Sequence, residues 1–258
     1  LRPRRAEASI VKTAVQPQTV RVAIYTRQSV ASDLAFGSID AQRDALYMAS
    51  EWDQRIYRWG FRENRIQSTI GDQLPNSWYW PLKGKTQTGS RILHHDGISQ
   101  KYNAFYASEW INGRYVHEID LDSQKLKRRF RFNGGASVGS TVDEEFRLLW
   151  VTHAWGISVF NLESGNLVAK HRAGFVNRPA VIDKTNGFVY FASTTRGRIF
   201  AYDRRSAKPL GTLVSGLGSR YLHFSPETNK LFAGTVTGSY VFDLSPESEI
   251  VRRLRGAK

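Results

Sequence analysis

The sequence predicts a mainly β fold, because one strand-and-turn pattern recurs through its C-terminal two-thirds. Four apolar-rich segments end in Asp120, Asn161, Asp203 and Asp243, and a polar turn follows each of them. The intervals between these residues are 41, 42 and 40. A repeat of about 40–45 residues is the length of one propeller blade. We therefore expect a partial or small β-propeller with four four-stranded blades, and possibly a fifth.

The order of elements within each repeat supports this prediction. An apolar strand such as Tyr190-Phe-Ala192 precedes each Asp-ending strand, and hairpin signals such as Asp183-Lys-Thr-Asn-Gly187 precede it in turn. The recurring Asp or Asn can accept backbone N–H bonds in the turn that follows, so we interpret it as structural rather than catalytic. Evenly spaced strands also occur in β-sandwiches, which remain the alternative fold.

The repeat resembles the YVTN/YncE-like propeller repeats over about residues 100–255. The resemblance rests on Leu149-Trp-Val-Thr152 and on the segment Ile157-Ser-Val-Phe-Asn-Leu-Glu-Ser-Gly-Asn-Leu-Val-Ala169. The Gly-His and Trp-Asp dipeptides typical of WD40 repeats are absent from these segments. The resemblance implies a non-catalytic binding or scaffold module, with a protein or an anionic ligand at the propeller face.

A shorter segment near the N-terminus has a different pattern. Val20–Tyr25 is typical of a buried strand, and Ser38–Leu46 predicts a helix with Ser38 as its N-cap. The segment resembles the start of a serine recombinase catalytic domain. The resemblance implies Ser29 as the nucleophile on a DNA phosphodiester, Arg27 as a phosphate ligand, and Tyr25 in the same pocket.

The recombinase resemblance ends near Met48. The second arginine cluster of that family does not appear between Glu51 and Ile98. We therefore expect a truncated, inactive remnant, and keep a recombinase-related DNA-binding protein as the alternative function. The predicted organisation is a disordered basic leader at 1–19, the remnant at 20–50, an aromatic-rich junction or degenerate blade at 51–98, and blades at 99–258.

The net charge of +14 favours polyanionic partners. One dense basic run is a candidate nucleic-acid contact, and the alternative is the solvated face of an edge strand. It comprises Lys125, Lys127, Arg128, Arg129 and Arg131. Because the remaining charge is diffuse, we expect only weak, nonspecific and salt-sensitive DNA binding.

Other features give weaker signals. The chain has no cysteine, which excludes disulfides and thiolate metal sites, and no apolar run is long enough to span a membrane. We expect a cytoplasmic protein with no membrane partner, no cofactor and no metal. The cluster Trp78-Tyr79-Trp80 could stack on a ligand or seal the core. His94-His95-Asp96 suggests a metal ligand set, but neighbouring strand residues point to opposite faces. His153 and His223 are placed near the inner strands.

Overall fold

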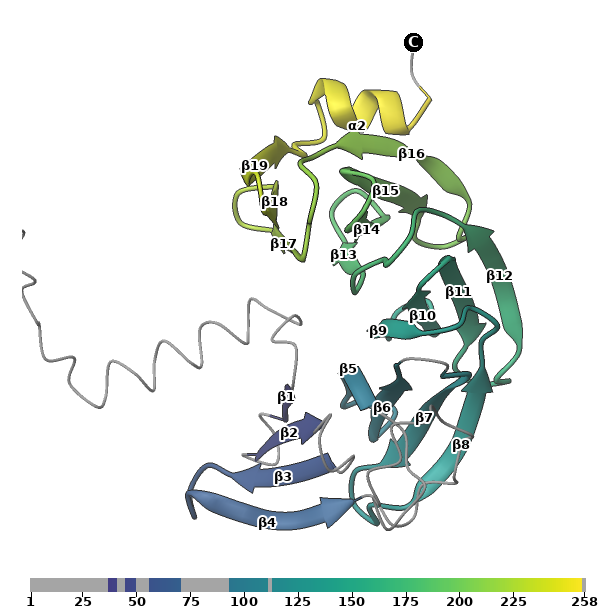
Figure 1. Ribbon diagram of the computed structural model, residues 1–258, viewed down its shortest axis with the longest axis vertical. Coiled ribbons are helices and arrows are strands. Elements are labelled where there is room, and N and C mark those ends of the chain that lie inside the picture. The colour runs from purple at the N-terminus through teal and green to yellow at the C-terminus, as the bar shows by residue number, and fades with distance from the viewer. Residues whose placement is uncertain (1–36, 41–44, 50–55, 71–92, 111–112, 257–258) are drawn as a thin grey trace, which may run out of the picture.

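The structure is a computed structural model that describes residues 37–40, 45–49, 56–70, 93–110 and 113–256. The described chain forms five small antiparallel sheets and one short helix, α2 (Glu249–Leu254). The mainly β class is therefore confirmed. Figure 1 shows the five sheets following one another along an open arc, with the chain passing through them in sequence order.

Each sheet is a meander in which strands adjacent in the chain pair with each other. The first sheet contains β1 (Gly37–Asp40), β2 (Ala45–Ala49), β3 (Ile56–Gly60) and β4 (Arg65–Ile70). The second contains β5 (Leu93–Ser99), β6 (Ala104–Glu109), β7 (Tyr115–Asp120) and β8 (Leu126–Arg131). The third contains β9 (Ser137–Asp143), β10 (Leu148–His153), β11 (Gly156–Asn161) and β12 (Leu167–Arg172).

The last two sheets differ in size. The fourth contains β13 (Val181–Asp183), β14 (Phe188–Ser193), β15 (Arg198–Asp203) and β16 (Pro209–Val214). The fifth has three strands rather than the expected four: β17 (Tyr221–Ser225), β18 (Lys230–Thr235) and β19 (Gly238–Asp243). In the second to fourth sheets, the first strand lies toward the inside of the arc and the last strand lies on the outside (Figure 1).

The core lies between the sheets, because neighbouring sheets pack their apolar faces together. Tyr47 of the first sheet stacks on Phe105 of the second at a ring-centroid distance of 5.6 Å. Phe130 of the second sheet contacts Phe160 of the third at 5.5 Å. Buried residues of β10 and β11 form one cluster with those of β14 and β15. Burial of these faces is the main favourable term holding successive sheets together.

The recurring Asp and Asn residues have the structural role that the sequence predicts. They end β7, β11, β15 and β19. The side-chain oxygen of Asn161 accepts from the backbone N–H groups of Glu163 and Ser164 at 2.9 and 2.8 Å. Asp120, Asp203 and Asp243 accept equivalent bonds from residues two or three positions later. These bonds explain why the strand ends at this residue type in each repeat.

The N-terminal expectation is wrong where the structure describes that segment. The helix predicted at Ser38–Leu46 is absent from its described residues, since β1 covers Gly37–Asp40 and β2 begins at Ala45. An alternating apolar and polar pattern of this length fits a hairpin strand as well as a short helix, and packing against the second sheet favours the strand. A fifth sheet therefore exists, and it begins earlier than the predicted junction.

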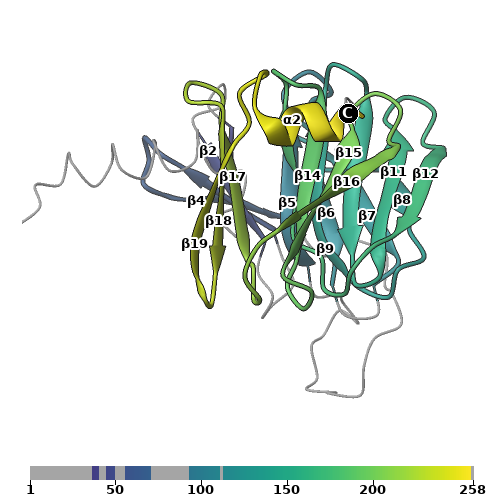
Figure 2. The same cartoon turned by 90° about the horizontal axis from the view of Figure 1, so that it is seen from above.

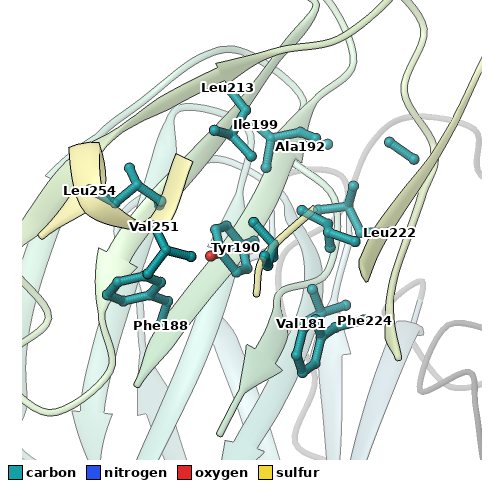
Figure 3. Packing of buried hydrophobic residues seen from close by; sticks show 14 residues of the cluster. Val181, Phe188, Tyr190, Ala192, Ile199, Leu213, Leu222, Phe224, Val251 and Leu254 are labelled. Carbon is teal, nitrogen blue, oxygen red and sulfur yellow. The ribbon is translucent and has the colours of Figure 1, made fainter. Parts of the chain in front are cut away.

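Helix α2 follows β19 in the chain and packs on the fourth sheet, alongside β16 (Figure 1). Its Val251 and Leu254 are buried among Phe188, Tyr190 and Leu213 of the fourth sheet (Figure 3). Ser248 caps the helix by accepting from the backbone N–H of Val251. The helix closes the outer side of the apolar cluster shared by the fourth and fifth sheets.

Candidate basic rim and cavity

The hairpin order divides the last four sheets into two ends. At one end, the second strand of each sheet starts and the third strand stops. Figure 2 shows the strands running between the two ends, and α2 lies at the upper end in this view. That end carries most of the carboxylates of these sheets: Asp120, Asp122, Asp143, Glu144, Glu145, Glu163, Asp183, Asp203, Glu227, Asp243 and Glu247. We call it the acid-bearing end.

At the opposite end, the β6–β7 hairpin of the second sheet begins at the buried Glu109, whereas the loops from the end of β8 onward contain no Asp or Glu. These loops are 132–136, 154–155, 173–180, 194–197, 215–220 and 236–237, and we call them the acid-free rim. Arg178, Arg196 and Arg220 lie in the rim, and Arg172 lies at its border, at the end of β12. None of these four guanidinium groups makes an ion pair with the described carboxylates, in contrast to Arg147 and Arg204 at the other end.

Backbone hydrogen bonds join the loops of the rim into one continuous edge. Each loop donates an N–H to a carbonyl of the preceding one: Val176 to Ala154 at 2.9 Å, Thr194 to Val176 at 3.0 Å, Gly218 to Thr194 at 2.7 Å, and Val236 to Leu217 at 3.2 Å. The rim is therefore a connected surface across three sheets rather than a set of separate loop tips.

A cavity of about 450 Å³ opens at the border of the rim. It lies between the loop after β8 and the outer strand of the third sheet, and it is lined by Asn133, His153, Trp155, Lys170, His171 and Arg172. The Lys170 ammonium group donates to the Asn133 carbonyl at 3.1 Å, and His171 Nε2 donates to the Ala207 carbonyl at 2.7 Å. The lining contains two cations and no carboxylate, so the cavity suits an anionic group.

An exposed aromatic pair flanks the cavity. The Trp155 and Phe175 rings lie 4.6 Å apart at 46°, and both side chains are more than a third exposed. Trp155 comes from the two-residue turn between β10 and β11, and Phe175 comes from the loop that leads to β13. Large exposed aromatic side chains beside unpaired cations are typical of binding surfaces.

His153 forms the inner wall of the cavity in its neutral state. It is 1% exposed, its ring stacks on Phe132 at 6.0 Å, and its Nε2 lies 3.3 Å from the Ser158 hydroxyl. Burial, and then the nearby Lys170 cation, lower the pKa of His153 to about 4. The Ser158–His153 contact is buried and has no described carboxylate beside it, so it does not form a catalytic triad.

Besides the cavity, the rim has a second place where positive charges lie close together, at Arg178 and Arg220. The Arg178 Nε donates to the Thr194 hydroxyl at 3.0 Å, and that hydroxyl donates to the Ser219 carbonyl at 3.1 Å. Arg178 therefore lies next to the peptide that precedes Arg220. Burial, and then the Arg220 cation, lower the pKa of Arg178. Two neighbouring cations without a bound carboxylate are a favourable place for an anion.

The basic run predicted as a nucleic-acid contact lies elsewhere, on β8 and in the turn before it, at the outer edge of the second sheet. Arg128 donates to Glu118 and to the Leu162 and Glu163 carbonyls, which joins the second sheet to the third. Lys127 lies 3.6 Å from Glu118. The Arg129 guanidinium covers the Tyr115 ring at 4.7 Å. Lys125 and Arg131 are exposed. The nucleic-acid role of this run stays a prediction, with part of its charge already compensated.

Several predicted site residues lie outside the described residues. These are the recombinase-like Tyr25, Arg27 and Ser29, and the cluster Trp78-Tyr79-Trp80. The segment His94-His95-Asp96 lies in β5. His223 lies in β17, stacked on Phe232 at 6.2 Å. Among the described residues, no group of three or more His, Asp or Glu is arranged to hold a metal ion.

The sequence interpretation missed the residues of the rim. Trp155, Lys170, Arg172 and Arg178 are separated along the chain, and none stands in a recognisable motif. The sequence feature that indicates the rim is the alternation of turns that contain Asp or Glu with turns that contain neither. This alternation is recognised only once every second turn is assigned to the same end of the sheets. In the described part of the chain, no helix is long and apolar enough to cross a membrane. No protein-family model matches the chain, and no curated protein matches its sequence.

Proposed function

We propose that this protein is a partial or small β-propeller that acts as a non-catalytic binding module. Five meander sheets succeed one another along an arc, and in the second to fourth sheets the first strand lies inside and the last strand outside, which supports a comparison with propeller blades (Figure 1). The repeat of 41, 42 and 40 residues and the shared Asp or Asn turn support the same reading. Propellers commonly bind partners on the loops at one end.

The segregation of charge carries the functional part of the proposal. Carboxylates and their paired cations gather at the acid-bearing end, whereas the acid-free rim presents arginines without described ion-pair partners. A surface of one sign attracts partners of the other sign and excludes partners of the same sign. The acid-free rim and its cavity therefore bind an anionic partner, with Lys170 and Arg172 contacting its charged groups.

Charge reversal at matched positions tests this assignment. The rim variant is Arg196→Glu with Arg220→Glu, and the control is Arg205→Glu with Lys208→Glu at the acid-bearing end. All four side chains are exposed, and the two variants change the net charge equally. The probe is fluorescein-labelled inorganic polyphosphate, and its binding is measured by fluorescence anisotropy at low and moderate salt.

We expect the rim variant to bind polyphosphate at least about tenfold more weakly, because phosphate contacts depend on local positive charge. The control should change the affinity less than about twofold at moderate salt, where charges more than about 8 Å away are screened. Equal losses in both variants would show that total charge, rather than the rim, determines binding. That result, or no binding by the unmodified protein, contradicts the proposed function.

A further inference from the structure

The acid-free rim combines positive charge with exposed apolar side chains at the tips of its loops. These tips are Trp155, Phe175, Leu217 and Val236, which are 51, 39, 55 and 74% exposed. Each comes from a different loop. An isolated exposed apolar residue needs no explanation, but four on one connected edge form a surface with a common direction.

The tips are held close together in two pairs. Trp155 and Phe175 are in ring contact at 4.6 Å. Leu217 accepts from the backbone N–H of Val236 through its carbonyl at 3.2 Å, and the Val236 side chain lies over Gly218. The Thr195 hydroxyl donates to the Phe175 carbonyl at 3.0 Å, and Thr194 accepts from Gly218 at 2.7 Å, which links the two pairs. The backbone therefore presents all four tips from one edge.

The chemistry of this edge identifies its partner. Arg172, Arg178, Arg196 and Arg220 lie among or beside the tips, and the rim contains no carboxylate. Aliphatic side chains such as Leu217 and Val236 gain little from a nucleic-acid strand, whose phosphates and sugars are polar. A lipid bilayer with anionic headgroups satisfies both features, because apolar tips enter its interface while arginines contact its phosphates. Tryptophan is also enriched at membrane–water interfaces.

We infer that the acid-free rim docks peripherally onto an anionic lipid bilayer and inserts Trp155, Phe175, Leu217 and Val236 into the interface. This inference rests on the proposed function, since it specifies which anionic partner the rim binds. It departs from the sequence-based expectation of no membrane partner, which depended on the absence of a spanning segment. Surface docking needs no such segment.

Vesicle binding by the full chain tests the inference. The probes are phosphatidylcholine vesicles with no phosphatidylserine and vesicles in which phosphatidylserine is about a third of the lipid. Each arginine near an anionic surface contributes roughly a fivefold gain in affinity, so the two vesicles separate electrostatic attraction from apolar binding. The tip variant is Leu217→Ser with Val236→Ser. The control is Leu167→Ser with Val168→Ser, whose side chains are each 51% exposed at the start of β12, near the acid-bearing end.

We expect binding to the anionic vesicles only, and a loss of about tenfold or more in the tip variant, since two aliphatic side chains no longer leave water. The control should bind like the unmodified protein. Thermal melting verifies that both variants remain folded. As a second measurement, brominated lipid should quench tryptophan emission in the unmodified protein, and Trp155→Phe should remove most of that quenching.

The possible failures are distinguishable. Vesicle binding that is unchanged in the tip variant, with no quenching, overturns the inference, because attraction would then be electrostatic only. Polyphosphate binding without vesicle binding overturns the inference and leaves the proposed function standing. Binding of acidic polyglutamate in place of vesicles points to a protein partner and also overturns it. If neither polyphosphate nor vesicles bind, the proposed function fails as well.

Discussion

The two ends of the sheets use charge in opposite ways. At the acid-bearing end, carboxylates end strands, organise turns and neutralise cations, as Asp143 does with Arg204 at 2.5 and 2.7 Å. At the acid-free rim, turns are closed by backbone bonds and hydroxyl groups, and the arginines stay uncompensated among the described residues. The acid-bearing end therefore uses its carboxylates for structure, whereas the acid-free rim leaves its arginines available to a partner.

The largest expected effect is on stability, and it concerns the acid-bearing end. Arg204 is buried and holds Asp143, which is also buried, so Arg204→Ala leaves an uncompensated carboxylate. We expect a loss of about 3–5 kcal/mol in the free energy of unfolding, measured by urea denaturation. The adjacent Arg205→Ala is the control, because Arg205 is exposed, and it should change stability by less than about 0.5 kcal/mol. Similar losses in both variants would contradict the structural role of the acid-bearing end.

A second effect concerns the cavity at the border of the rim and depends on pH. The pKa of His153 is lowered to about 4 in the folded protein, so the unfolded chain binds a proton more readily. His153 therefore contributes stability above about pH 6.5 that is lost as the pH falls toward 4, by about 1.4 kcal/mol per pH unit in that window. His153→Gln should remove this slope in urea denaturation at pH 7.5, 6 and 5.

The matched control for this slope is His223→Gln, since His223 is only partly buried in β17. It should leave the slope in place. A slope that survives His153→Gln would mean that the pKa values of other groups differ between the folded and unfolded states, and that His153 in the cavity wall is not the source of the pH dependence.

A smaller effect comes from a turn of the acid-bearing end. The first hairpins of the second to fifth sheets place Asn103, Arg147, Gly187 and Asn229 in the left-handed region, with φ of 49, 58, 75 and 50°. Arginine is the least suited of these to that conformation. Arg147→Asn should raise the free energy of unfolding by about 0.5–1 kcal/mol. Its exposed ion pair with Glu163 is worth little. Polyphosphate binding should stay unchanged, and a lower stability would contradict the expectation.

No effect at all is expected from the recombinase-like segment. A nicked suicide substrate should form no covalent adduct with the protein, because the second arginine cluster that the resemblance requires does not appear between Glu51 and Ile98. Ser29→Ala should therefore be indistinguishable from the unmodified protein on a denaturing gel. An adduct that disappears in Ser29→Ala would replace the binding-module proposal with DNA chemistry.

The sequence was informative where local chemistry determines structure. Asp120, Asn161, Asp203 and Asp243 predicted strand ends and turns because the side chain bonds to its own neighbouring backbone. The prediction failed at Ser38–Leu46, where packing against the second sheet favours strands over the helical pattern. The rim could not be found from sequence alone, since Trp155 and Phe175 meet only after the third sheet and its exit loop have folded.

The separation of carboxylates from unpaired arginines has a consequence at distances beyond contact. It gives the molecule an electric dipole roughly along the strands of its last three sheets, with the positive pole at the acid-free rim. In the field of a negatively charged surface such a dipole experiences a torque, so the protein turns its rim toward the surface before the two meet. Productive encounters then become more frequent than random tumbling allows, and this advantage in the association rate fades as salt shortens the range of the field.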